Sequence, residues 1–243
     1  MKIAFISDIH GNSWALKAVL DDIKDRGISE IYDLGDSLYG PLDPKATYHL
    51  LMDWKINSIC GNQDRYIFES NDDFDINPTL KFVKTQLFEG AVNWLKSLPQ
   101  SGIIHDQIYL CHGTPANDSE YLLEQLHDNF VNVKDYTKIE VLLADIKQKI
   151  IICGHSHRPA IVETPDRIII NPGSVGLPAY DDEKPIPHKI ENYSPKARYC
   201  IIDLGRSMMV DHVAVSYDYE NAAVAAEIHK RDDWARWLRT GIA

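Results

Sequence analysis

The chain has 243 residues, of which 44% are hydrophobic and 25% are charged, a balance typical of a soluble globular protein. Its formal net charge of −11 disfavours nucleic acid as a partner, because proteins that bind nucleic acid carry basic stripes. No apolar run approaches the roughly 18 residues that a membrane span needs, and the N-terminus lacks the pattern of a secretory signal peptide.

The first part of the chain alternates short apolar runs with helical patterns. The run of β-forming residues directly after Met1 predicts a buried strand, and residues 30–34 and 56–60 predict two more. Apolar residues recur at a helical period over 14–26, and a proline-containing turn precedes a second predicted helix over 45–54. This strand-helix-strand-helix-strand order predicts an α/β fold with parallel strand pairing.

The middle and end of the chain predict helices, hairpins and one long loop. Residues 65–100 are expected to be mostly helical, and residues 119–148 helical but broken. Predicted hairpins lie within 103–111, 160–170 and 199–215, and a buried strand is predicted over 149–153. Residues 178–197, rich in Pro, Asp and Lys, predict a long loop, which in a compact domain is usually functional or mobile.

A C-terminal helix is predicted over 220–238, and residues 1–243 are interpreted as a single domain. Trp234 and Trp237 on this helix are expected to pack within the chain or to contact a second copy in a homo-oligomer.

Five predicted strands end in side chains that can bind a divalent metal. These side chains are Asp8 with His10, Asp36, Asn62, His112, and His155 with His157. Asp8 and His10 are two residues apart, so in an extended segment both side chains point to the same side. Because sites in open α/β sheets form at the carboxyl ends of strands, this repetition predicts a metal site there.

These motifs, taken in order, resemble the calcineurin-like metallophosphoesterase superfamily. The motifs are Asp8-x-His10, Gly35-Asp36, Gly61-Asn62-x-Asp64, His112-Gly113 and Gly154-His155-x-His157. Residues 171–176, Asn-Pro-Gly-Ser-Val-Gly, resemble the YfcE-like bacterial and archaeal phosphodiesterases of that superfamily. The resemblance covers about residues 1–204 and implies a four-layer α/β/β/α sandwich of two mixed sheets, with two metal ions between the sheets.

Carried over position by position, the resemblance assigns the ligands to two divalent metal ions. Asp8, His10 and His157 would hold the first, and Asn62, His112 and His155 the second, with Asp36 bridging them. Oxygen and nitrogen ligands suit borderline metals, of which Mn is favoured and Fe, Zn, Ni and Co are alternatives. Two cations about 3.5–4 Å apart clamp the attacking and leaving oxygens and lower the pKa of a bridging water towards about 7. The expected reaction is attack of a metal-bridging hydroxide on phosphorus.

Gln63 departs from the pattern of the superfamily. Many members carry Gly-Asn-His in the third motif, where the His is the proposed proton donor to the leaving group. Gln63 can donate a hydrogen bond to a phosphate oxygen, but it cannot act as a general acid. His188 in the predicted loop is one candidate acid. Otherwise good leaving groups, such as aryl or nucleotidyl phosphates, are expected to be favoured.

Several further polar residues fit either a role in the site or a plain structural role. Asn12 fits a contact to phosphate or the cap of the following helix. Arg65 and Arg158 adjoin ligand motifs and fit bidentate phosphate binding or an ordinary surface role. Asp33 and Asp64 fit the orientation of ligands or ordinary turns.

The cysteines are widely spaced and form no CxxC pair, which predicts free thiols and a reducing, cytoplasmic location. Cys60, Cys111 and Cys153 lie close to predicted ligands in the sequence. Free cysteines are among the most buried residue types, so core packing is favoured over metal binding.

The leading hypothesis is a two-metal phosphohydrolase that cleaves phosphodiester or phosphoanhydride bonds of a small substrate, such as a nucleotide. A phosphomonoesterase, a protein phosphatase and a non-catalytic metal-binding scaffold are the alternatives. A scaffold should have lost ligands, and all seven are present. A metallo-β-lactamase-like hydrolase would need a His-x-His-x-Asp-His run, which Pro159 and Ala160 interrupt.

Overall fold

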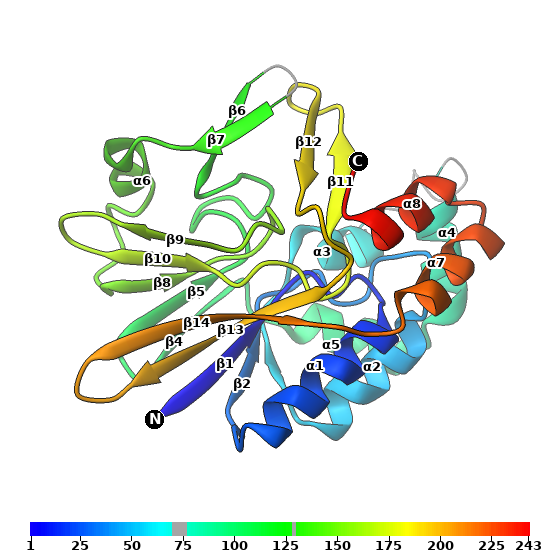
Figure 1. The fold of residues 1–243 in the computed structure, drawn as a ribbon, viewed down its shortest axis with the longest axis horizontal. Helices are drawn as coiled ribbons and strands as arrows, with labels where there is room; N and C mark the ends of the chain where they lie inside the picture. Colours follow the sequence, from blue (N-terminus) through cyan, green and yellow to red (C-terminus); the bar gives the residue numbers. More distant parts are fainter. Residues whose placement is uncertain (70–76, 128–129) are drawn as a thin grey trace.

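The computed structural model describes residues 1–69, 77–127 and 130–243. Within these residues two five-stranded sheets face each other (Figure 1). The first sheet has the order β14-β13-β1-β2-β3, formed by β1 (Lys2–Ile6), β2 (Ile31–Asp33), β3 (Asn57–Ser58), β13 (Ala197–Leu204) and β14 (Met208–Val215). The second has the order β4-β5-β8-β10-β9, formed by β4 (Ser101–Ile104), β5 (Ile108–Cys111), β8 (Ile150–Ile152), β9 (Ala160–Glu163) and β10 (Ile168–Asn171).

Both sheets are mixed. In the first, β1, β2 and β3 pair in parallel, and β13 and β14 are added in antiparallel pairing. In the second, β8 lies parallel to β5 and β10, while the pairs β4–β5 and β9–β10 are antiparallel hairpins. The predicted parallel pairing and the three predicted hairpins are therefore confirmed.

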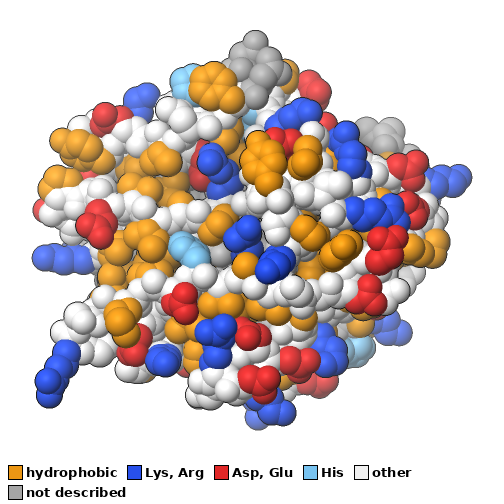
Figure 2. Space-filling view, viewed as in Figure 1, with side chains coloured by type: hydrophobic (Ala, Val, Ile, Leu, Met, Phe, Trp, Pro, Cys, Tyr) orange, Lys and Arg blue, Asp and Glu red, His pale blue; other side chains and the backbone are white. Residues whose placement is uncertain are grey.

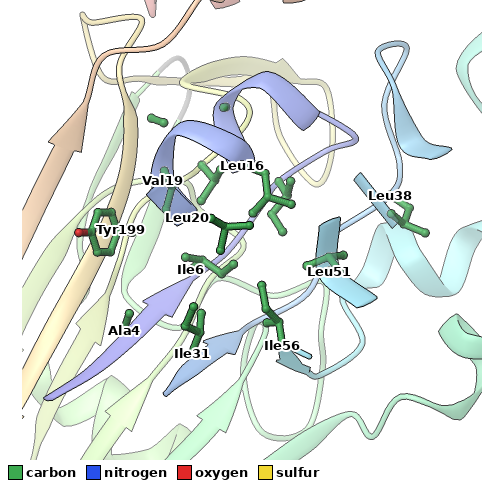
Figure 3. Packing of buried hydrophobic residues seen from close by; sticks show 14 of the residues in the cluster. Ala4, Ile6, Leu16, Val19, Leu20, Ile31, Leu38, Leu51, Ile56 and Tyr199 are labelled. Carbon is green, nitrogen blue, oxygen red and sulfur yellow. The ribbon is translucent and has the colours of Figure 1, made fainter. Parts of the chain in front are cut away.

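Helices cover the outer face of the first sheet. They are α1 (Ser13–Asp25), α2 (Pro44–Asp53), α3 (Asn62–Glu69), α4 (Pro78–Gln86) and α5 (Glu89–Ser97). Leu16 and Leu20 of α1 reach the strand residues Ala4 and Ile6, as Figure 3 shows, and all four side chains are buried. A smaller apolar cluster lies outside the second sheet, where α6 (Tyr136–Leu142) places Ile139 against Ile151 and Ile169. The sequence of layers is therefore α/β/β/α.

The space between the two sheets is apolar. Ile3 and Phe5 from β1 pack there with Leu110, Ile152 and Ile170 from the second sheet, and all five are nearly inaccessible to solvent. Burial of such side chains contributes about 1.5–3 kcal/mol each. This core holds the two sheets together and brings the carboxyl ends of their parallel strands to a common edge. All four cysteines are free and buried, as predicted for free thiols. Of the three predicted to pack in the core, Cys111 and Cys153 lie in the apolar cluster outside the second sheet, whereas Cys60 is buried outside the clusters.

Two segments differ from their predicted conformation. Part of the predicted helical region 119–148 is a hairpin of β6 (Glu124–His127) and β7 (Phe130–Val133), and residues 128–129 between them lie outside the described residues. The predicted loop 178–197 contains a second hairpin, β11 (Ala179–Asp182) and β12 (His188–Glu191). In β12 buried His188 and Ile190 alternate with Lys189 and Glu191, the period of two that a strand requires.

The predicted C-terminal helix is two helices, α7 (Tyr219–Ile228) and α8 (Asp232–Thr240). Lys230 between them has φ +60°, which an α-helix excludes, so the chain turns there. The predicted helical region 65–100 contains part of α3, α4 and α5, and its residues 70–76 lie outside the described ones.

Acidic and basic side chains are interspersed over the face of the molecule in Figure 2. In the described part of the chain, no helix has the length and apolar character needed to cross a membrane.

Candidate metal centre

The loops that follow the strands carry unusual backbone conformations. Asp8, His10, Asp36, His155 and His157 all have positive φ, between 52° and 68°. Non-glycine residues rarely adopt this left-handed region, and each occurrence costs about 1–3 kcal/mol. Such strain is concentrated where the surrounding structure fixes side chains for a function. We call residues 8–12, 35–38, 61–64, 112–114 and 154–157 the ligand loops.

The first group of side chains contains Asp8, His10 and His157, all buried. The Nδ1 atom of His10 lies 3.0 Å from the carbonyl oxygen of Tyr39, and that of His157 lies 2.7 Å from the carbonyl oxygen of Leu177. Each Nδ1 therefore carries a proton and donates it, which leaves both Nε2 atoms with a lone pair. These two Nε2 atoms lie 3.0 Å apart. Two lone pairs at this separation repel each other unless a cation, either a metal ion or a shared proton, lies between them.

The carboxylate of Asp8 adds to this requirement. Its Oδ2 accepts a hydrogen bond from the backbone N–H of His155 at 3.2 Å. Its Oδ1 is buried, has no hydrogen-bond partner among the described residues and lies 3.4 Å from Nε2 of His157. Burial and the neighbouring His157 lower the pKa of His10 to about 4, so this ring is neutral at pH 7, as a metal ligand must be.

The second group contains Asp36, His112 and His155, joined by Asn62. His112 donates from Nδ1 to the carbonyl oxygen of Leu34 at 2.8 Å. Its Nε2 lies 3.0 Å from Oδ1 of Asn62 and 3.3 Å from Oδ2 of Asp36. Although burial opposes it, the charge of Asp36 raises the pKa of His112 to about 10, so a metal must displace a proton here. Metal binding is therefore expected to strengthen as the pH rises.

The two groups are adjacent, and each fits a divalent ion. Within each group, one ligand atom per residue lies within 4.8 Å of the others, and Nε2 of His112 lies 4.0 Å from Oδ1 of Asp8 in the first group. The donors are imidazole nitrogens and carboxylate oxygens, the set that suits borderline divalent metals. The structure thus places all seven predicted ligands together.

Buried carboxylates hold the loop that carries Asp36. Asp64 accepts hydrogen bonds from the backbone N–H groups of Ser37, Leu38 and Gly61 at 3.0–3.3 Å. Asp33 accepts from the Ser37 hydroxyl at 2.6 Å. Of the two roles predicted for these residues, the geometry therefore supports the positioning of ligands. Gly61 is required here because a Cβ would lie 2.2 Å from the Asp36 carboxylate.

Two residues considered for phosphate binding have their polar atoms occupied within the protein. Oδ1 of Asn12 accepts from the backbone N–H of Ala15 and caps α1, while Nδ2 donates to the carbonyl oxygen of Gly176 at 2.9 Å. Arg65 makes a bidentate ion pair with Asp118, with both contacts at 2.8 Å. Arg65 is not among the described residues that line the cavity at the metal centre.

Gln63 lies in the wall of the cavity at the metal centre, whereas His188 lies behind that wall. Gln63 lines the cavity, its backbone N–H donates to Asp36 at 2.8 Å, and its Oε1 is buried with no partner among the described residues. His188 lies behind Tyr121, with Nε2 2.8 Å from the Tyr121 hydroxyl. That hydroxyl is 2.5 Å from the Tyr180 hydroxyl, which in turn donates to the carbonyl oxygen of His155. His188 therefore reaches the metal centre only through these tyrosines.

A cavity of about 190 Å³ lies over the two groups. Its walls include further residues that the motifs did not indicate as lining the site, among them Tyr121, Tyr180, Arg231, Trp234 and Trp237. These five come from residues 121–127, 179–191 and 231–240. We call these three segments, together with residues 130–134 that pair with 124–127, the covering segments. In Figure 1 the β11–β12 hairpin stands between the β6–β7 hairpin and α8, and it contacts both neighbours. The tryptophans on α8 are the one sequence signal available, and the sequence predicts for them packing or contact with a second copy rather than a place in the site.

The comparisons with known proteins agree with this geometry. A family model described as the calcineurin-like phosphoesterase superfamily domain matches residues 1–190. The uncharacterized protein MJ0912 of Methanocaldococcus jannaschii is 30% identical over 260 residues, covering 96% of this chain and 94% of that protein.

Two solved structures share the fold over nearly the whole chain. A metallophosphoesterase from Sphaerobacter thermophilus has a TM-score of 0.77 at 22% identity, covering 100% of this chain and 99% of its own. The hypothetical protein PH1004 from Pyrococcus horikoshii has a TM-score of 0.75 at 21% identity, covering 99% of this chain and 98% of its own.

Proposed function

The chain belongs to the calcineurin-like phosphoesterase superfamily, and from this premise we propose that it hydrolyses phosphodiester or phosphoanhydride bonds with two divalent metal ions. The observation that carries the proposal is the 3.0 Å approach of the His10 and His157 Nε2 atoms, whose Nδ1 protons are already donated elsewhere. The Oδ1 of Asp8, which has no hydrogen-bond partner among the described residues, supplies an anionic oxygen to the same point.

The seven predicted ligands would divide between the ions as two groups that share Asp36. Asp8, His10 and His157 would hold one ion, and Asn62, His112 and His155 the other. When bound, the ions would activate a water at neutral pH and neutralise charge on the phosphate. Mn is the favoured metal, with Fe, Zn, Ni and Co as alternatives.

The remaining chemistry belongs to side chains of this chain. The Gln63 amide lines the cavity and can donate to a phosphate oxygen, but it cannot protonate a leaving group. The aromatic walls shield the reacting atoms: the Tyr180 ring lies 4.6 Å from that of His157, and the Trp234 ring 5.8 Å from that of His10. Exclusion of water strengthens electrostatic interactions inside the site. A leaving group that departs without a proton is favoured, because Gln63 cannot supply one.

Turnover of bis-p-nitrophenyl phosphate with added Mn²⁺ tests the proposal. The wild-type protein should show metal-dependent release of p-nitrophenolate, and Asp36→Ala should lose it. If the protein binds metal and turns over no phosphoester with any of the five metals, it is a scaffold of this fold and the proposal fails.

The leaving group gives a second test. Across a series of aryl phosphodiesters, the rate should depend steeply on the pKa of the leaving phenol, because Gln63 supplies no proton. A flat dependence would mean that another group protonates the leaving oxygen. Tyr121, supported by His188, would then be the first residue to substitute.

A further inference from the structure

A second, wider cavity opens beside the metal centre. Its volume is about 880 Å³, against about 190 Å³ for the cavity over the ligand groups. Asn62, Tyr121, His155 and Asp182 line both cavities, so the two spaces meet at the second group of ligands. A substrate whose phosphate lies at the metal centre can therefore extend directly into the wider space.

The volumes of the two cavities determine which part of a substrate each cavity can hold. Cavities that enclose drug-sized molecules measure about 300–1,000 Å³. The cavity at the metal centre falls below this range, so it has room for the phosphate and one small group only. The wider cavity falls within the range. Any larger group esterified to the phosphorus must lie there.

The lining of the wider cavity indicates what kind of group it accepts. Asn117, Ser119 and Gln125 offer amide and hydroxyl groups that both donate and accept hydrogen bonds. Leu126, Pro185 and Ile186 add an apolar surface. This mixture suits a compact polar group with flat apolar faces, and it is unfavourable for an acyl chain, which would leave the amides unpaired.

Acidic residues outnumber basic ones in the same lining. Lys134 and Lys184 contribute two ammonium groups, and Glu120, Glu124 and Asp182 contribute three carboxyl groups. Lys134 is partly committed, since its ammonium donates to the carbonyl oxygen of Tyr121. A lining with more carboxyl than ammonium groups gives no net attraction to a long polyanion, so it favours an uncharged group over a chain of further phosphates.

We propose that the wider cavity, between the β6–β7 hairpin and the 182–186 turn, binds an uncharged polar organic group of about nucleoside size esterified to the reacting phosphorus. The preferred substrates are then phosphodiesters that carry one large polar group and one small group. This inference rests on the proposed hydrolase function, and it adds the division of the substrate between the two cavities.

Two diesters with the same leaving group test the proposal. Methyl p-nitrophenyl phosphate and the p-nitrophenyl ester of thymidine 5′-monophosphate differ only in the size and polarity of the second group. With Mn²⁺-loaded protein, kcat/KM should be about tenfold or more higher for the thymidine ester, the value of one or two added hydrogen bonds with buried partners. Equal kcat/KM values for the two esters would overturn the proposal.

Variants of Gln125 test the location. Gln125→Trp fills part of the wider cavity and should reduce the preference for the thymidine ester towards unity, while Gln125→Ala should reduce it less. Val133→Trp on the neighbouring strand is the matched control, because Val133 is 49% exposed and lies outside the described lining. If Gln125→Trp and Gln125→Ala keep the full preference, the large group binds elsewhere.

Hydrogen exchange gives a readout that does not depend on turnover. Thymidine 5′-monophosphate, but not methyl phosphate, should slow exchange in β6 and in the 182–186 turn of the Mn²⁺-loaded protein. If neither diester is hydrolysed but this protection is seen, the hydrolase function fails and the binding site stands. If the diesters are hydrolysed but both ligands leave these segments unprotected, the binding site fails and the hydrolase function stands.

Discussion

The ligand loops and the covering segments meet at one cavity, but they are built differently. The ligand loops are buried, carry left-handed backbone at five of the seven predicted ligands, and are cross-linked by carboxylates such as Asp64. The covering segments are two hairpins and a helix that contribute mainly aromatic and long polar side chains. α8 also lies beyond residue 190, where the family match ends. From this difference we expect that the ligand loops determine the chemistry and that the covering segments determine the choice of substrate.

The largest effect is expected from a ligand. Asp8→Asn keeps the shape of the side chain but removes the charge from the oxygen that has no hydrogen-bond partner among the described residues. Turnover of bis-p-nitrophenyl phosphate should fall about 10³-fold, because a bound metal contributes several kcal/mol of charge stabilisation and each 1.36 kcal/mol is tenfold. Metal analysis of the purified protein should show that one of the two ions is lost.

Asp21→Asn is the control for this variant. Asp21 lies on the exposed face of α1 and pairs with Lys17, far in the chain from any ligand loop. It should retain full turnover and metal content. If the Asp8→Asn protein retains full turnover and full metal content, the first group does not bind a metal. The ligand loops would then not be the part of the molecule that determines the chemistry.

Glu124, a residue of the covering segments, should instead affect how the free energy of unfolding depends on pH. Burial raises the pKa of Glu124 on β6 to about 7, well above its ordinary value of 4.5, despite a hydrogen bond from Ser156. The folded protein therefore binds one more proton than the unfolded chain between these values, so this group's contribution to stability falls as the pH rises from about 4.5 to about 7. Glu124→Gln removes this dependence.

Urea unfolding from pH 4.5 to 8 measures the effect. The free energy of unfolding of Glu124→Gln minus that of the wild type should rise with pH, by up to about 3 kcal/mol over the window. Glu163→Gln, at an exposed position on β9, should give a flat difference. A flat difference for Glu124→Gln as well would mean that the Glu124 carboxyl is solvated through the wider cavity.

The ligand loops could be predicted from the sequence because their chemistry is local. Each ligand directly follows an apolar run, and the i, i+2 spacing of His155 and His157 is visible without any tertiary information. Parallel strands then bring these loops to one edge whatever the details of packing. The same rule did not reveal how Asp33 and Asp64 would act, because their partners are backbone N–H groups and the Ser37 hydroxyl, and no local sequence pattern links these groups.

The covering segments could not be predicted because long-range contacts determine their structure. The strand β7 gains its pairing from β6 and its packing from β12, and neither contact is encoded in a local period. The charged and proline-rich composition of 178–197 did not indicate its two short strands, in which only Ala179, His188 and Ile190 are buried. Arg231 reaches the cavity because the chain turns at Lys230, and nothing in an otherwise helical pattern marks that turn.

A residue that only positions ligands should have a smaller and recoverable effect. Asp64→Asn removes one of the oxygens that accept the Ser37, Leu38 and Gly61 N–H groups. Metal affinity should fall about 10–100-fold, the usual consequence of losing such support. Saturating Mn²⁺ should restore much of kcat, which it cannot do for Asp8→Asn. Asp53→Asn, exposed at the end of α2, is the control and should leave metal affinity and kcat unchanged. If Asp64→Asn loses kcat and no metal concentration restores it, Asp64 is more than a positioning residue.

The smallest predicted effect lies in the covering segments, at Arg231. Its guanidinium is held by Asp233 and by the Thr79 hydroxyl, and it lies 5.4 Å from the centre of the Trp234 ring, which leaves further N–H groups to face the cavity. Arg231→Ala should raise KM for bis-p-nitrophenyl phosphate about tenfold, because a charge-assisted hydrogen bond contributes about 1.5–3 kcal/mol. kcat and metal content should stay close to wild type. The KM of Arg231→Lys should lie between those of the wild type and Arg231→Ala, since lysine keeps the charge without the fork geometry.

Arg236→Ala, on the exposed side of α8, is the control and should change neither kcat nor KM. A fall in kcat at unchanged KM would show that Arg231 stabilises the transition state. A covering segment would then contribute to the chemistry, and the division of roles between the two regions would be wrong at this residue.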